Sequence, residues 1–67
     1  MRTGVLNVWF PDRNYGFIHE QTNGEIVSHF LHASNVTSGT PRTGAKVVFQ
    51  RVQGTKGSLA VNAEVQS

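Results

Sequence analysis

Hydrophobic and polar residues alternate along most of this chain with a period of two. In residues 4–10, GVLNVWF, alternate positions place Leu6, Val8 and Phe10 on one face and leave Trp9 on the other. Such alternation indicates a half-buried β-strand. The full pattern predicts five strands, over residues 4–10, 15–22, 25–33, 45–53 and 58–65. In the last strand, we expect one face to hold Leu59, Val61, Ala63 and Val65.

Turn-forming residues separate these segments. PDRN at 11–14 is a turn, Asn23-Gly24 is the strongest short hairpin signal, and GTKG at 54–57 is a hairpin loop. Residues 34–44 form a longer loop, with one short helical turn expected at 34–36. Five short strands in 67 residues favour a barrel, because closure removes exposed strand edges. We therefore predict an all-β, five-stranded antiparallel barrel that forms a single domain over residues 1–67.

The Asn23-Gly24 loop also predicts a register. A two-residue loop places opposite each other those residues whose numbers add to 47. Phe17 then faces Phe30, and Tyr15 faces His32. All four rings share one face of the hairpin.

The opposite face of this hairpin carries Ile18 and Leu31, which supply aliphatic core, with Gly16 where a larger side chain would crowd a tight barrel. The rings are therefore not needed for the core. Ordered, exposed rings beside Arg13 are what base stacking requires, since the rings meet bases and the cation meets phosphate. The structural alternative is that the rings are cross-strand pairs that only stabilise the sheet.

Composition supports a β fold and restricts the other classes. Nine Val, two Ile and six Thr are β-branched, and the net charge of +2 slightly favours a polyanionic partner. There is no cysteine for a disulfide or thiolate site, and no apolar run long enough for a transmembrane helix or signal peptide. We expect a cytoplasmic protein.

Catalysis and metal binding have little support in the sequence. The four acidic residues are scattered over turns and strand surfaces, and GTKG is too short for a phosphate-binding loop. His29 and His32 are three apart on a strand and so point to opposite faces. We expect no enzyme activity, no metal and no cofactor.

Two polar residues fit the predicted pattern poorly. His29 falls on the inner face opposite Ile18, and Arg51 falls in phase with Val47 and Phe49. A position at the barrel rim or a β-bulge that turns it outward would account for His29, and a β-bulge or a strand end would account for Arg51.

The chain resembles a known family in several motifs. RNYGFI is similar to the first ribonucleoprotein motif, usually Lys-Gly-Phe-Gly-Phe-Ile, and FLHASNV is similar to the second, of the Phe-Val-His-x-Ser-x-Ile type. VWF and GAKVVFQRVQGTKGSLAVNAEV resemble the first strand and the closing half of the same family. The family is the cold-shock domain, and the resemblance runs from about residue 4 to residue 65. It implies an OB-fold barrel that binds single-stranded RNA or DNA.

The resemblance also implies site residues. The stacking positions correspond to Trp9, Tyr15, Phe17, Phe30 and His32, and the cations near the bound strand correspond to Arg13 and Lys56. Phe10 is expected in the core. The implied role is that of an RNA chaperone and regulator of transcription or translation, acting as a monomer without a membrane or a small-molecule cofactor.

The chain departs from the family pattern in several places. The gap from Trp9 to Tyr15 is one residue shorter, which is expected to displace Trp9 along the surface. Ala33 stands where many members carry another ring, and the loop after Val36 is shorter. Fewer rings and fewer cations predict weaker binding or a shorter footprint.

Two alternatives stay open at this point. A second alignment takes IVSHF as the second motif, with His29 as its histidine. A different function is also compatible with the pattern: a small β-barrel module whose aromatic patch binds a protein or peptide.

Overall fold

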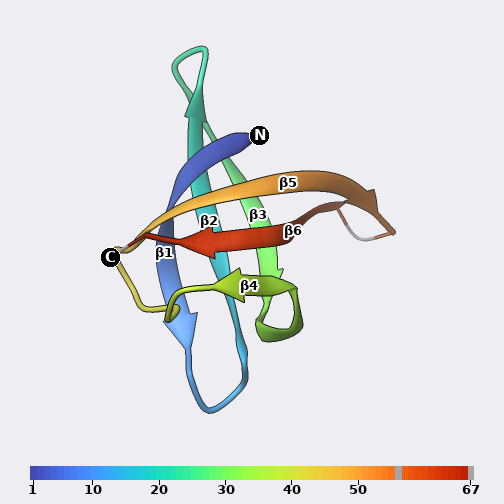
Figure 1. Cartoon of the computed structure of the whole chain (residues 1–67). Helices are drawn as coiled ribbons and strands as arrows, with labels where there is room; N and C mark the ends of the chain where they lie inside the picture. Colours follow the sequence, from blue (N-terminus) through green and yellow to red (C-terminus); the bar gives the residue numbers. More distant parts are fainter. Residues whose placement is uncertain (56, 67) are drawn as a thin grey trace.

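The computed structural model describes residues 1–55 and 57–66 and consists almost entirely of strands (Figure 1). The described residues contain no helix long and apolar enough to cross a membrane. The five predicted strands are present, and the long loop adds a short sixth one. The elements in chain order are β1 (Arg2–Phe10), β2 (Tyr15–Thr22), β3 (Glu25–His32), the 3-10 turn η1 (Ala33–Asn35), β4 (Val36–Ser38), β5 (Lys46–Gly54) and β6 (Gly57–Val65).

The strands form one sheet that closes on itself. Their order is β3-β2-β1-β5-β6-β4, and an additional pairing of β3 with β6 completes the barrel. The pairs along β3-β2-β1-β5-β6 are antiparallel, whereas the short contacts of β6 with β3 and β4 are parallel. β5 and β6 cross the β1–β2–β3 sheet steeply, and the end of β5 and the start of β6 project past β3 (Figure 1). The predicted all-β barrel is confirmed.

The β2–β3 turn has the geometry that its sequence predicts. Asn23 and Gly24 both have positive φ, at 52° and 78°. Two successive positive φ values define the type I′ turn, whose twist matches that of antiparallel strands. Thr22 consequently faces Glu25, and the predicted register holds along the whole hairpin.

The core is small and lies between the two crossing layers. Its buried side chains are Leu6, Ile18, Leu31, Ala45, Val47, Phe49, Ala60, Ala63 and Val65. A Cβ added to Gly16 would lie 2.2 Å from the carbonyl oxygen of Val8 and 2.8 Å from Cε3 of Trp9. The absence of a side chain at Gly16 is therefore a condition for β1 and β2 to approach this closely.

β1 does not keep the predicted alternation. Leu6 pairs with Ile18 but Val8 pairs with Phe17, so Asn7 is an extra residue in a β-bulge. In the part of β1 that follows the bulge, the residues that simple alternation would point inward point outward, and the others point inward. The expectation that Leu6, Val8 and Phe10 share one face is therefore wrong.

β6 contains a second bulge. Between the pairs Val48–Glu64 and Gln50–Val61, β6 has one residue more than β5, and Asn62 there has a φ of 51°. Leu59 and Val61 are consequently half-buried on one face, whereas Ala63 and Val65 are buried in the core. The predicted single face of this strand is therefore wrong.

Candidate nucleic-acid interface

Three aromatic rings of the β2–β3 hairpin form a contiguous cluster. The ring centroids of Tyr15 and Phe30 lie 5.5 Å apart, those of Phe17 and Phe30 lie 5.7 Å apart, and those of Tyr15 and Phe17 lie 6.2 Å apart. All three residues are half-buried, outside the core. Their pairing follows the predicted register, with Phe17 opposite Phe30 and Tyr15 opposite His32. The hairpin thus presents an ordered aromatic surface.

Phe10 extends this cluster, contrary to the expectation that it lies in the core. It pairs with Tyr15, and the two ring centroids are 5.3 Å apart. The bulge at Asn7 causes the difference, because it turns Phe10 to the ring-bearing side of the sheet. We call Phe10, Tyr15, Phe17, Phe30 and His32 the ring face.

Trp9 lies on the other side of β1 from Phe10. It pairs with Gly16, packs against the buried core and remains half-buried. Its backbone N–H donates to Oγ1 of Thr43 at 3.1 Å, which ties β1 to the loop before β5. The structure therefore places Trp9 at the margin of the barrel rather than on the ring face.

His32 is held in one orientation at the end of β3. Its Nδ1 accepts the backbone N–H of Ser34 at 3.1 Å and caps η1, and Oγ of Ser34 lies 3.0 Å from the same nitrogen. His32 is exposed, so the rest of its ring remains available to a ligand. The contribution of Ser34 was not predicted, since it depends on the turn that follows the strand.

Arg13 is exposed in the turn that joins β1 to β2. The backbone N–H groups of Arg13 and Asn14 both donate to the carbonyl oxygen of Phe10, at 3.0 and 2.9 Å. The carbonyl oxygen of Asn14 accepts from the N–H of Ala33 at 2.8 Å, which anchors the turn to η1. Arg13 is thus carried on a fixed turn beside the ring face. Lys56, the other predicted cation, lies outside the described residues.

A groove of about 490 Å³ runs between the ring face and the β5–β6 hairpin. Rings of β2 and β3 form one wall, and residues of the β5–β6 hairpin, most of them with small side chains, form the other. Its lining residues are Phe17, Phe30, Gly54, Thr55, Gly57, Ser58 and Leu59. Aromatic side chains on a groove wall are the feature on which bases stack in proteins that bind single strands.

A second groove, of about 420 Å³, lies elsewhere on the surface. It is lined by Thr3, Gly4, Val5, His19, Gln21, Ile26 and Lys46. It has one imidazole and one cation but none of the Phe, Tyr and Trp rings. The first groove is therefore the better candidate for a base-binding site.

His29 occupies the barrel interior. It is 0% exposed and pairs with Ile18, whereas His32 faces Tyr15 on the opposite side of the hairpin. The second alignment, which treats His29 as the motif histidine, is therefore wrong, and the predicted opposite orientation of the two histidines is confirmed.

Comparisons with known proteins agree with this geometry. The model of the 'Cold-shock' DNA-binding domain matches residues 2–66. The chain belongs to the cold-shock domain family. It is also 41% identical over 59 residues to a cold shock-like protein of Aquifex aeolicus (strain VF5), a match that covers 85% of this chain and 84% of the relative. The family resemblance seen in the motifs is thus confirmed.

Proposed function

We propose that this cold-shock domain binds single-stranded RNA or DNA by stacking bases on the ring face. The observation that carries the proposal is the ordered cluster of half-buried rings outside the core, beside a groove of about 490 Å³. Aliphatic residues such as Ile18 and Leu31 fill the interior, so the rings are not required there. Stacking is tolerant of sequence, because every base has a π-face.

The arrangement suggests a division of roles. Phe10, Tyr15, Phe17 and Phe30 offer ring surfaces to successive bases, with His32 at the end of the row. Arg13, together with the predicted Lys56, supplies cations for phosphates. Trp9 remains a predicted stacking residue, at the margin of the site.

A protein of this kind would act as an RNA chaperone in transcription or translation, and its expected compartment is the cytoplasm. Binding only the unpaired form of a strand shifts the equilibrium of a weak hairpin toward the open form by mass action. No nucleotide hydrolysis is needed, since the free energy comes from binding. Catalysis has no place in this mechanism, and a monomer is sufficient for it.

Salt dependence is the experiment that tests the proposal. If about three phosphates are neutralised, the logarithm of the affinity falls against the logarithm of salt with a slope near −2, at roughly −0.7 per contact on single strands. The affinity of a labelled oligothymidine is measured by anisotropy across a salt series, with a duplex of equal length as control. A flat response would refute nucleic-acid binding and favour a peptide ligand for the ring face, and equal affinity for the duplex would refute binding by base stacking on single strands.

A further inference from the structure

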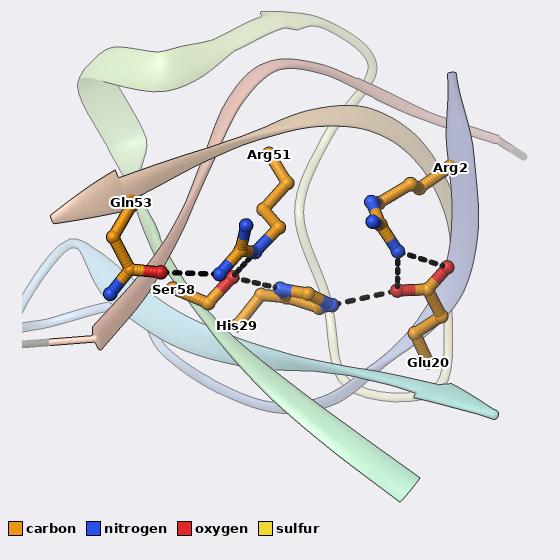
Figure 2. A network of polar contacts seen from close by, with 6 residues as sticks. All are labelled: Arg2, Glu20, His29, Arg51, Gln53 and Ser58. Atoms are coloured by element: carbon orange, nitrogen blue, oxygen red, sulfur yellow. Dashed lines mark hydrogen bonds and ion pairs between the residues drawn. The ribbon is translucent and has the colours of Figure 1, made fainter. Parts of the chain in front are cut away.

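A chain of polar side chains crosses one end of the barrel (Figure 2). At its centre, His29 is 0% exposed, and its ring centroid lies 4.9 Å from that of Phe49. His29 is the one fully buried polar side chain among residues 1–55 and 57–66. The members of the chain, in order, are Gln53, Arg51, Ser58, His29, Glu20 and Arg2.

Short hydrogen bonds join these groups. Nδ1 of His29 lies 2.6 Å from Oγ of Ser58, and its Nε2 lies 2.9 Å from Oε1 of Glu20. Nε of Arg51 donates to Oγ of Ser58 at 2.8 Å, and Nη1 of Arg2 donates to Oε1 of Glu20 at 3.0 Å. The two residues that break the predicted strand pattern, His29 and Arg51, thus meet through one hydroxyl group.

The chemistry at the two ends restricts where the protons between them can lie. Burial raises the pKa of Glu20, but the hydrogen bonds from His29 and Arg2 and the Arg2 charge hold it below its ordinary value. Glu20 is therefore a carboxylate that only accepts, and Arg51 only donates. If His29 is neutral with its proton on Nε2, it donates to Glu20, and its Nδ1 accepts from the Ser58 hydroxyl, which in turn accepts from Arg51. In this arrangement each donor along the chain from Arg51 through Ser58 and His29 to Glu20 has an acceptor.

The central bond lies at the seam that closes the barrel. β3 and β6 share one backbone pair, Phe30 with Leu59. The contact of His29 with Ser58 is one residue earlier on both strands. Phe30, Ser58 and Leu59 also line the groove beside the ring face. The seam and the groove therefore share a wall.

We propose that His29 is a positioning residue for this groove. Its bond to Ser58 holds the start of β6 against β3 and so sets the distance between the ring of Phe30 and the opposite wall. A fully satisfied buried network favours one arrangement of the strands that contribute to it. The consequence for base binding rests on the proposed function, whereas the consequence for the seam does not.

The test uses Ser58→Ala, which removes the hydroxyl, and Ser58→Thr, which restores it. Ser38→Ala, an exposed serine of β4, is the matched control. Amide hydrogen exchange, measured without ligand, is expected to accelerate about fivefold at residues 57–60 in Ser58→Ala and to stay unchanged in the β1–β2 pair. That factor corresponds to about 1 kcal/mol, the usual net value of one hydrogen bond. Affinity for oligothymidine is expected to fall about fivefold, and Ser58→Thr is expected to restore both properties.

The readouts separate the possible failures. Unchanged exchange at residues 57–60, or faster exchange with unchanged affinity, would overturn the positioning role. If the unaltered protein fails to bind oligothymidine, the proposed function is lost, and hydrogen exchange alone then decides whether the bond holds the seam. ¹⁵N NMR of the unaltered protein adds a test that needs no variant. It should show His29 with its only ring proton on Nε2, and a proton on Nδ1, alone or together with one on Nε2, would contradict this arrangement.

Discussion

Truncation of Phe17 and of Leu31 separates binding from folding on the two faces of one hairpin. Phe17 contacts two rings, with centroids 6.2 Å away at Tyr15 and 5.7 Å away at Phe30. Each such pair contributes roughly 0.2–1 kcal/mol to the sheet, so Phe17→Ala should cost up to about 2 kcal/mol of unfolding free energy. The loss of one stacked base should cost about 1–3 kcal/mol of binding, which is roughly a 5- to 150-fold rise in Kd.

Leu31 should behave in the opposite way. It is 0% exposed in the core, so Leu31→Ala should cost about 2–5 kcal/mol of unfolding free energy. A chain of 67 residues has a total stability of roughly 3–10 kcal/mol, so this variant is expected to be close to unfolding. Any fraction that remains folded should bind with nearly unchanged affinity, because Leu31 does not line the groove.

The assay pairs two measurements on each variant. Urea unfolding is followed by the fluorescence of Trp9, which packs against the core and so reports folding. Binding is followed by the anisotropy of a labelled oligothymidine, at protein concentrations corrected for the folded fraction. If Phe17→Ala unfolds the protein while Leu31→Ala melts normally and fails to bind, the assignment of the two faces is wrong.

Two further predictions concern stability. Gly16→Ala should lower the melting temperature strongly, because its Cβ would lie 2.2 Å from a backbone carbonyl oxygen of β1. The control is Gly24→Ala, whose Cβ meets no atom, so it should lose only about 1–2 kcal/mol of unfolding free energy, which is the cost of a positive φ. Equal melting temperatures of the two variants would contradict the close approach of β1 and β2. Since the pKa of Glu20 is lowered by folding, its stabilisation is complete above the unfolded value of about 4.3 and is lost as the pH falls through the lower folded value. Glu20→Gln should therefore have a lower free energy of unfolding at pH 7, but this free energy, measured by urea unfolding, should decline less steeply below about pH 4. A decline as steep as that of the unaltered protein would count against a lowered pKa of Glu20 in the folded state.

The features that were predictable from the sequence are those fixed by local chemistry. Asn23-Gly24 specifies a type I′ turn by itself, and the turn then fixes which ring faces which along eight residues of each strand. The alternation that follows assigns Ile18 and Leu31 to the core. The four ring-face residues of the hairpin, Tyr15, Phe17, Phe30 and His32, are therefore predictable from the sequence, whereas Phe10 is not.

The features that were missed depend on contacts between distant strands. A bulge at Asn7 or Asn62 adds one residue to one strand only, and strand alternation alone does not show where that residue lies. Asparagine within a strand is a weak hint, since it is depleted there and tolerates positive φ. The pairing of His29 with Ser58 requires the closure of β3 onto β6, which joins residues 29 positions apart. His29 and Arg51, which both bond to Ser58, look misplaced until that seam is formed.

The bulge in β1 leads to a last prediction, about the neighbours Trp9 and Phe10. Their roles are exchanged relative to simple alternation, because Phe10 lies against Tyr15 on the ring face while Trp9 packs on the core beside Gly16. Phe10→Ala should therefore weaken oligothymidine binding by about 1–3 kcal/mol with a small cost in stability. Trp9→Ala should cost at least about 2 kcal/mol of unfolding free energy and weaken binding less than Phe10→Ala does.

The comparison requires a folding probe that both variants retain. Far-ultraviolet circular dichroism during urea unfolding serves this purpose, since Trp9→Ala removes the only tryptophan. The control is Val5→Ala, an exposed position of the same strand before the bulge, which should change neither property by more than about 0.5 kcal/mol. If Trp9→Ala abolishes binding at full stability while Phe10→Ala only destabilises, then the bulge at Asn7 does not exist in solution. In that case β1 keeps an unbroken alternation, with Phe10 in the core and Trp9 on the surface.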